Sequence, residues 1–222
     1  VGLCLPVAPD AGQDISGAGA PMFATYLAGI FLELARCFAL VLLLVERMLV
    51  DLRRAARTDG LTGLLNRGAV LADGQACLLQ CQRQQQPLAL LLLDVDHFKQ
   101  INDRWGHLTG DQVLHHFAAV LAGSLASQQH LLGRYGGEEF VVLLPGADHA
   151  RARQQAASIR VQLQAHPAHV GDTPVVVTTS IGLVVGTGAH DLAALLAAAD
   201  RALYQAKADG RDRTVSAVPQ PA

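Results

Sequence analysis

The segment from Arg134 to Leu144 restricts the fold and the function of this chain more than any other. It reads Arg-Tyr-Gly-Gly-Glu-Glu-Phe and continues as Val-Val-Leu-Leu, so residues that favour strands flank a Gly-Gly pair. Glycine adopts positive φ at little cost, which allows a tight turn and a close approach to a ligand. The pattern predicts a β-hairpin with Glu138 and Glu139 near its tip. Taken alone, it fits a solvated hairpin as well as a site for a cation or for proton abstraction.

A second acidic pair follows an apolar run upstream. Residues 88–93 are entirely apolar and predict a buried strand. Asp94 and Asp96 are two residues apart at its carboxyl end, so their side chains project to one side. Ligands of open α/β sheets bind at this end of the strands. Carboxylate oxygens suit Mg²⁺, which takes its remaining ligands from water and substrate phosphates.

Two further polar residues extend this acidic pair. Lys99 and Asn102 are three residues apart, so they share one face if a short helix begins here. An Asp-x-Asp sequence alone is common in surface turns. Combined with a strand end, a lysine, an asparagine and the Gly-Gly-Glu-Glu hairpin, it indicates a nucleotide site.

These motifs together resemble the GGDEF family of diguanylate cyclases, in its GGEEF variant. The resemblance runs from Thr58 to about Ser216 and implies an α/β (α+β) fold, with a ferredoxin-like cyclase-palm sheet flanked by helices and preceded by a long N-terminal helix. Six motifs match in family order: Thr58–Arg67, Asp94–Asn102, Gly106–Asp111, the hairpin, Thr178–Gly182 and Ala199–Arg211.

The resemblance implies that two GTP molecules condense to cyclic di-(3′-5′)-GMP and two pyrophosphates. Its metal ligands would be Asp94, the Val95 carbonyl and Glu138, holding Mg²⁺ with Mn²⁺ as an alternative. Glu138 would also activate the ribose 3′-hydroxyl. Glu139 would support a metal-bound water or the hairpin, and Asp96 would either support the ligands or cap a helix. A non-catalytic GTP-binding signalling module is the alternative function.

Further family positions concern the phosphates. Lys99 matches the phosphate-binding lysine and would stabilise transition-state charge, whereas Lys207 and Arg211 match the pair that reaches the terminal phosphates. Gly136 and Gly137 leave room for a phosphate at the hairpin.

Other positions concern the base. Asn102 and Asp111 match the guanine-reading residues. A carboxylate that accepts from guanine N1–H and N2–H₂ discriminates against adenine, so Asp111 favours GTP over ATP. His107 would line the base pocket, with a structural histidine as the alternative.

One family feature is missing. Many members carry an inhibitory product site, Arg-x-x-Asp, before the Gly-Gly pair, but Ser127 and His130 occupy those positions here. Neither supplies a bidentate guanidinium, so we expect no ordinary product feedback.

The N-terminal part has a different composition. Residues 1–21 are rich in Gly, Ala and Pro and predict a loop or linker, whereas residues 22–45 are apolar except for Glu33 and Arg36. A helix over that stretch spans about 36 Å, enough for a bilayer core. The i,i+3 spacing of the two charges allows them to pair.

Two interpretations of residues 22–57 remain open. An arginine-rich flank after the apolar stretch predicts a transmembrane helix with its carboxyl side in the cytoplasm: Arg47, Arg53, Arg54 and Arg57 against Glu46 and Asp51. A 4-3 stripe predicts a coiled coil: Phe31, Ala35, Phe38, Leu42, Val45, Leu49, Leu52 and Ala56. A membrane helix that continues into a dimeric stalk would satisfy both. We expect a homodimer at the bacterial inner membrane with a cytoplasmic catalytic domain, or alternatively a cytoplasmic protein.

Composition and periodicity complete the predictions. A net charge of −2 and 5% aromatic residues argue against nucleic acid as a partner. We expect a catalytic domain over 58–216 and a tail over 217–222. The predicted elements are helices over 64–86, 107–125, 148–166 and 191–208, strands over 88–95 and 175–185, and a hairpin over 131–144.

Overall fold

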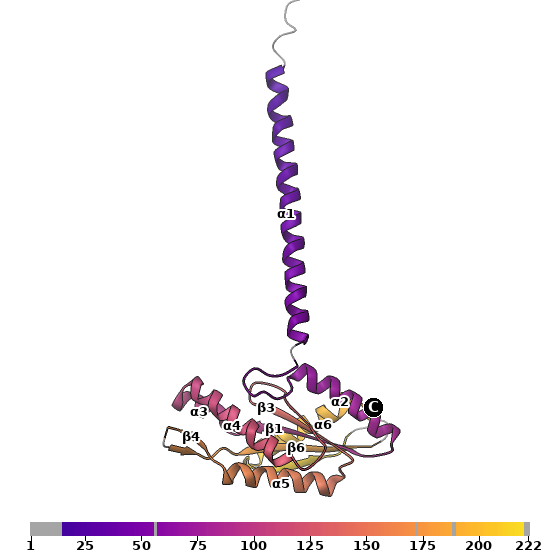
Figure 1. Cartoon of the computed structure of the whole chain (residues 1–222), viewed down its shortest axis with the longest axis vertical. Helices are drawn as coiled ribbons and strands as arrows, with labels where there is room; N and C mark the ends of the chain where they lie inside the picture. Colours follow the sequence, from indigo (N-terminus) through magenta and orange to yellow (C-terminus); the bar gives the residue numbers. More distant parts are fainter. Residues whose placement is uncertain (1–14, 56, 172, 188–189, 220–222) are drawn as a thin grey trace, which may run out of the picture. The chain divides into compact units, whose positions relative to one another are not determined.

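The computed structural model describes residues 15–55, 57–171, 173–187 and 190–219. Contacts between Cα atoms divide the chain into two units, Val1–Ala55 and Ala56–Ala222, each described here by itself. The first contains one long helix and the second contains a mixed α/β fold (Figure 1).

Helix α1 (Ile15–Ala55) accounts for the described part of the first unit. The loop predicted over residues 1–21 is wrong for residues 15–21, because glycine and proline lower helix propensity without forbidding a helix. Residues 1–14 lie outside the described residues. The predicted pairing of Glu33 with Arg36 is confirmed, with 2.9 Å between Oε2 and Nη2.

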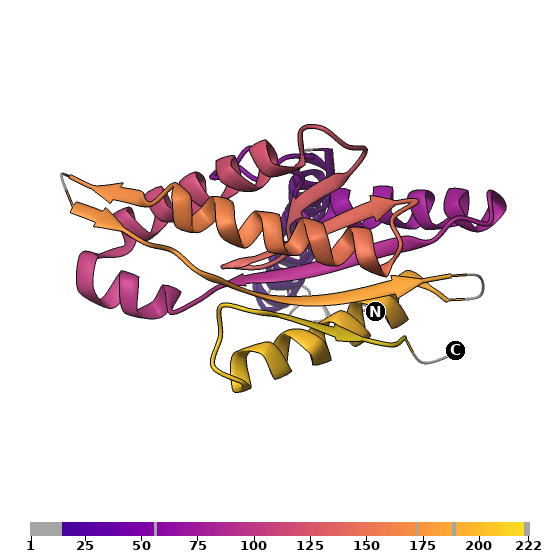
Figure 2. The ribbon, with the colours of Figure 1, turned by 90° about the horizontal axis from the view of Figure 1, so that it is seen from below.

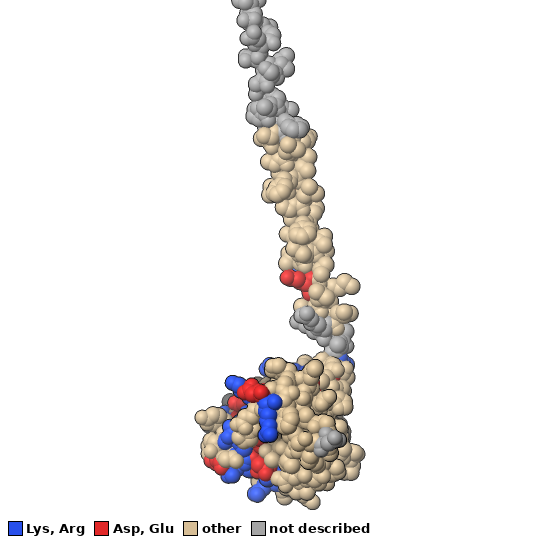
Figure 3. Space-filling model, turned by 90° about the vertical axis from the view of Figure 1, so that its left-hand side faces the viewer, with Lys and Arg blue, Asp and Glu red and all other residues tan. Residues whose placement is uncertain are grey.

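A long apolar segment lies within α1. Ala24–Val50 has a mean hydropathy of 2.3, and none of its most apolar window is buried within the chain. The part of this helix that is not drawn grey is mostly uncharged on the face seen in Figure 3. The described side chains of the 4-3 stripe are exposed, for example Phe31 at 75% and Phe38 at 65%. By length and composition, this segment is able to cross a membrane.

The second unit alternates helices and strands around a five-stranded sheet. Its elements are α2 (Arg67–Arg83), β1 (Leu88–Val95), α3 (Phe98–Trp105), α4 (His107–Leu125), β2 (Leu131–Arg134), β3 (Glu139–Pro145), α5 (His149–Ala165), β4 (Ala168–Val170), β5 (Thr173–Val175), β6 (Thr179–Gly186), α6 (Leu192–Ala208) and β7 (Thr214–Ala217). The strand order is β2-β3-β1-β6-β7, and every pair is antiparallel except β6–β7. Figure 2 shows α6 running alongside β6 and β7.

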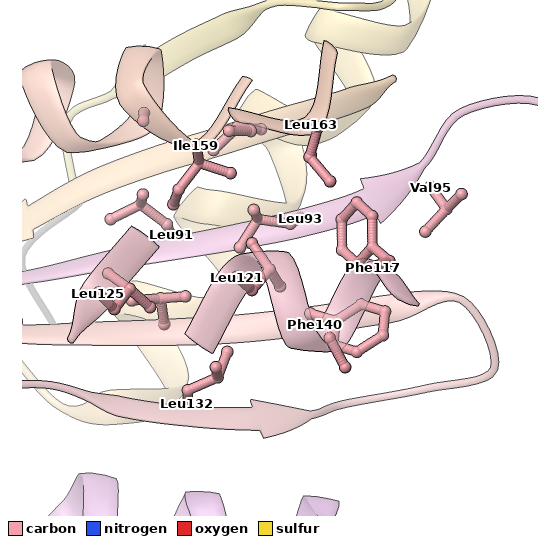
Figure 4. Packing of buried hydrophobic residues seen from close by; sticks show 14 of the residues in the cluster. Leu91, Leu93, Val95, Phe117, Leu121, Leu125, Leu132, Phe140, Ile159 and Leu163 are labelled. Carbon is pink, nitrogen blue, oxygen red and sulfur yellow. The ribbon is translucent and has the colours of Figure 1, made fainter. Parts of the chain in front are cut away.

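Strand β1 lies at the centre and is buried at every position. Its alternate side chains join two different hydrophobic clusters, one packed with α4 and α5 and the other with α2 and α6. Both faces of the sheet are therefore covered, which explains the continuous apolar run from Leu88 to Leu93. In the first cluster, Phe117 of α4 packs against Phe140 of β3, with ring centroids 4.9 Å apart (Figure 4).

The ends of β1 and α4 agree with the predicted ranges, whereas the strand predicted over 175–185 is divided. β4 and β5 form a separate two-stranded sheet, and β6 begins only at Thr179. A β-branched run indicates extended backbone but not which partner it pairs with, so the break was not predictable. Strand β7 was also not predicted, and it places Ala217 in the sheet rather than in the tail.

We expect Gly182→Ala to destabilise the second unit by about 2 kcal/mol, because overpacking a dense core is costly. A Cβ at Gly182 would overlap the backbone of α6 at Ala199 and Leu203. Gly123→Ala is the matched control, because a Cβ there meets nothing within 4 Å, and we expect it to be neutral or slightly stabilising. Urea unfolding of both variants measures the difference, and equal stabilities would contradict this account of the packing.

Candidate functional site

The end of β1 brings the predicted acidic residues together. Asp94 pairs in register with Glu139 of β3 on one side and with Ser180 of β6 on the other. The Val95 amide donates a hydrogen bond to the Glu138 carbonyl at 3.2 Å. The hairpin carboxylates therefore lie beside the strand end that carries Asp94.

These carboxylates lie close enough to affect one another's ionisation. Burial raises the pKa of Asp94, and the nearby Lys207 and Arg211 cations offset only part of this effect. Burial and the Asp94 charge also raise the pKa values of Glu138 and Glu139. Lys207 Nζ lies 2.7 Å from Asp94 Oδ2. Clustered carboxylates with raised pKa values are stabilised by a cation, and here Lys207 supplies one.

The donor set also fits a divalent cation. Asp94 is 5% exposed, and its charge acts on the half-buried Glu138, so hard oxygen ligands lie near one another at the end of β1. Within the described residues, no group of three or more His, Cys, Asp or Glu side chains surrounds a single point. Carboxylate oxygens suit Mg²⁺, which usually retains water and substrate ligands.

One pocket marks the accessible side of this site. A pocket of about 440 Å³ adjoins Glu139 and Lys207 and is lined also by Asp200, Arg201, Leu203 and Tyr204. Acidic and basic side chains lie next to one another on one side of the second unit (Figure 3). A groove of about 600 Å³ lies instead between α4 and α5 and is lined by small and polar residues, among them His116, Ser124 and Gln162. We place the candidate site at the carboxylates of Asp94 and Glu138, because these side chains can bind a cation.

Arg134 fixes the tip of the hairpin. Its Nε and Nη2 donate to the Gly137 carbonyl at 3.1 and 2.6 Å, and its Nη1 donates to both carboxylate oxygens of Asp59 at 3.1 and 3.2 Å. Burial raises the pKa of Asp59, but hydrogen bonds from Thr62 and Arg134 outweigh it, so the net pKa is lowered. The entry segment is thus tied to the hairpin, a contact between two distant motifs that the sequence analysis missed.

The glycines of the hairpin act differently from the prediction. Gly136 and Gly137 do not have positive φ, so that expectation is wrong. A Cβ at Gly136 would lie 2.5 Å from Glu139 Oε2, so a larger residue there would force the Glu139 carboxylate to move. The amides of Tyr135 and Gly136 donate to the Glu139 carbonyl at 2.8 and 3.2 Å and close the turn.

Helices α3 and α4 carry the remaining predicted residues. Lys99 lies exposed on α3, confirming the short helix. His107 is exposed at the start of α4, and Asp111 is exposed one turn later. Asn102 Oδ1 is buried without a hydrogen-bond partner among the described residues, and a Cβ at Gly110 would overlap it. An unsatisfied buried oxygen is costly and marks a position where a ligand can bind.

Asp96 does not cap a helix, so that alternative is wrong. The residue before α3 is His97, which has φ +57° and makes no side-chain capping bond. Asp96 instead accepts hydrogen bonds from Ser180 Oγ at 2.6 Å, Thr178 Oγ1 at 2.9 Å and the Asp212 amide at 3.0 Å. Its carboxylate therefore joins β6 to the turn that follows α6.

The end of α6 brings in the last two predicted residues. Gly210 has φ +111°, and its amide donates to the Lys207 carbonyl at 3.4 Å, while the Arg211 amide donates to the Ala206 carbonyl at 3.0 Å. This is the Schellman arrangement, which ends a helix with glycine. It places Arg211 directly after the helix that carries Lys207. The Arg211 charge offsets part of the rise that burial causes in the pKa of Asp94.

The fold and the site define a cyclase-palm domain with a candidate nucleotide site. The family model described as "Diguanylate cyclase, GGDEF domain" matches residues 56–213. The chain therefore belongs to the GGDEF family, and the family predicted from the sequence is confirmed.

Individual relatives support the same assignment. The diguanylate cyclase DgcP of Pseudomonas aeruginosa is 42% identical over 74% of this chain and 24% of its own length. A coiled coil and GGDEF domain of DgcB from Caulobacter crescentus, solved with c-di-GMP, has a TM-score of 0.69 at 31% identity, over 88% of this chain and 99% of that chain. The active GGEEF domain of a Vibrio cholerae diguanylate cyclase has a TM-score of 0.64 at 34% identity, over 72% and 99%. The chain spans from 24% to 50% of the length of the first three curated relatives.

We expect Arg134→Ala to destabilise the second unit by about 1–3 kcal/mol, because it leaves the Asp59 carboxylate and the Gly137 carbonyl without this donor. In an Asp59→Ala background the same change should cost measurably less, since one of the two contacts is already lost. Urea unfolding of the four proteins tests this coupling. Strictly additive effects would show that Asp59 and Arg134 do not interact.

Proposed function

We propose that this chain is a diguanylate cyclase, which condenses two GTP molecules into cyclic di-(3′-5′)-GMP with release of two pyrophosphates. The observation that carries the proposal is the meeting of Asp94 and Glu138 with the Lys207 and Arg211 cations at the end of β1. This combination supplies ligands for a metal and counter-charges for phosphates in one place.

Asp94, the Val95 carbonyl and Glu138 would hold the divalent cation, Mg²⁺ or alternatively Mn²⁺. When bound, the cation neutralises phosphate charge and lowers the pKa of the ribose 3′-hydroxyl. Glu138 accepts the proton of that hydroxyl, a step for which a carboxylate alone is too weak a base. Glu139 supports the hairpin through its backbone carbonyl, which closes the turn.

Three basic side chains would bind the phosphates. Lys207 neutralises Asp94 at 2.7 Å, and its flexible side chain lets it turn to a phosphate once a metal shares that carboxylate. Arg211 follows in the turn after α6, and its charge also acts on Asp94. Lys99 is exposed on α3 and would stabilise charge on the transferred phosphoryl group.

Asn102 and Asp111 would select the base. The exposed Asp111 carboxylate accepts from guanine N1–H and N2–H₂, and the unpartnered Asn102 Oδ1 provides a further acceptor in reach of the same face. Adenine lacks the N1–H and N2–H₂ donors, so it would leave the Asp111 carboxylate without these hydrogen bonds. His107 lies one turn before Asp111 and would line the base pocket.

The reaction requires two copies of the chain, because each catalytic unit holds one GTP. The exposed stripe on α1 would form a parallel coiled coil. The apolar segment of the same helix would span the bacterial inner membrane. The arginine-rich flank and the catalytic unit would then lie in the cytoplasm. The DgcB fragment from Caulobacter crescentus, which contains a coiled coil and a GGDEF domain, supports the coiled-coil part of this arrangement.

We expect Glu138→Gln to lower the rate of product formation about 100-fold or more, because even indirect supports of a metal ligand contribute 10- to 100-fold. The change keeps the size of the side chain and removes its charge. Product formation from GTP and Mg²⁺, followed by mass spectrometry, measures the effect. A fully active variant would rule out this mechanism. A wild-type chain that binds GTP but makes no product when forced to dimerise would favour the non-catalytic GTP-binding module.

We also propose that the enzyme lacks the Arg-x-x-Asp product-inhibition site. Ser127 is exposed, and the His130 ring is engaged locally, with Nδ1 2.9 Å from the Gln128 carbonyl. Neither side chain offers the forked donors that bind a phosphate or a guanine edge.

We expect cyclic di-GMP to leave the initial rate of the wild-type enzyme unchanged, whereas the double variant Ser127→Arg/His130→Asp should be inhibited by it. Rates measured over a titration of product test both expectations, with Ser127→Ala/His130→Ala as the matched control. Tight binding of cyclic di-GMP to the Ser127/His130 surface of the wild-type protein would contradict the proposal.

A further inference from the structure

The turn after α6 has an unusual backbone. Gly210, Arg211 and Asp212 have φ values of +111°, +63° and +41° in succession. Residues other than glycine pay a free-energy cost in this region and adopt it only where surrounding contacts impose it. The contacts that hold Asp212 therefore decide the conformation of its neighbour, Arg211.

Asp212 is held by two elements that are far from it in sequence. Its amide donates to Asp96 Oδ2 at 3.0 Å. Its carboxylate accepts from Arg160 Nε at 2.9 Å and from Gln164 Nε2 at 3.0 Å. Arg160 and Gln164 are four residues apart on α5 and so present one face to the turn.

The two anchors are of different kinds. Asp96 is 4% exposed and is fixed by Ser180 and Thr178 of the strand region around β6. The Arg160 and Asp212 side chains are 28% and 34% exposed, so solvent weakens their attraction without abolishing it. Helix α5 packs with the hydrophobic cluster on the opposite face of the sheet from α6. Arg160 thus acts on the turn from outside the nucleotide site.

We propose that Asp96 and Arg160 are positioning residues, which hold Asp212 and thereby keep Arg211 in place for the terminal phosphates of the nucleotide. The proposal rests on the proposed function, since it concerns how Arg211 meets GTP. A turn held in the binding conformation loses less entropy when the ligand binds. The network should consequently affect the binding of a triphosphate but not of a nucleoside monophosphate.

The test compares nucleotide affinities of the full chain in detergent with Mg²⁺ by calorimetry, using a non-hydrolysable GTP analogue and GMP. We expect Arg160→Ala to weaken binding of the GTP analogue about three- to tenfold, the range that follows from loss of a partly buried ion pair and its hydrogen bond. GMP affinity should stay the same. Arg153→Ala, a change at an exposed arginine of the same helix, is the control and should leave both affinities unchanged.

A second comparison separates positioning from general loss of structure. In an Arg211→Ala background, Arg160→Ala should cause no further loss of affinity for the GTP analogue, because the group that it positions is absent. An unchanged GTP-analogue affinity in Arg160→Ala, an equal loss for GMP, or a full loss in the Arg211→Ala background would each overturn the inference. The proposed function fails separately if the wild-type chain does not bind the GTP analogue or if Arg211→Ala leaves its affinity unchanged.

Discussion

The buried carboxylate of Asp94 and its ion pair with Lys207 are the interaction on which the site depends. A charge that is 5% exposed is costly unless another charge or hydrogen-bond donors compensate it. Lys207 provides that compensation at 2.7 Å, yet the pKa of Asp94 remains raised because burial outweighs its partners. Lys207 therefore does not fully compensate the buried negative charge, and a metal ion with bound phosphates would stabilise it further.

The hydrophobic core fixes the position of the Asp94 carboxylate. Strand β1 is buried on both faces, and its register with β3 and β6 leaves no freedom in where Asp94 meets Glu139 and Ser180. Polar contacts then set the surrounding segments. Arg134 ties the hairpin to Asp59, and Asp96 ties β6 to the turn that carries Arg211. Apolar packing positions the strand ends, and buried hydrogen bonds position the loops between them.

The sequence predicted those parts that local patterns encode. The apolar run of β1 and the helical periodicity of α4 gave their ends correctly, and the family motifs brought Asp94, Glu138, Lys207 and Arg211 to one site. Hydrogen bonds and ion pairs between residues that are distant in sequence could not be predicted from such local patterns.

Three contacts show this limit. Arg160 and Asp212 are 52 positions apart, Arg134 and Asp59 are 75 apart, and Asp96 and Asp212 are 116 apart. No periodicity or spacing reports such a contact. The same holds for β7, whose four residues become a strand only by pairing with the edge of β6. Positive φ at the hairpin glycines was predicted wrongly because glycine signals close approach as well as unusual torsions.

A crystal structure of this chain with Mg²⁺ and a non-hydrolysable GTP analogue would test the account most directly. The account predicts a metal at Asp94, the Val95 carbonyl and Glu138, with Lys207 moved from Asp94 to the phosphates and guanine against Asn102 and Asp111. A nucleotide bound elsewhere, with Lys207 still paired with Asp94, would contradict it.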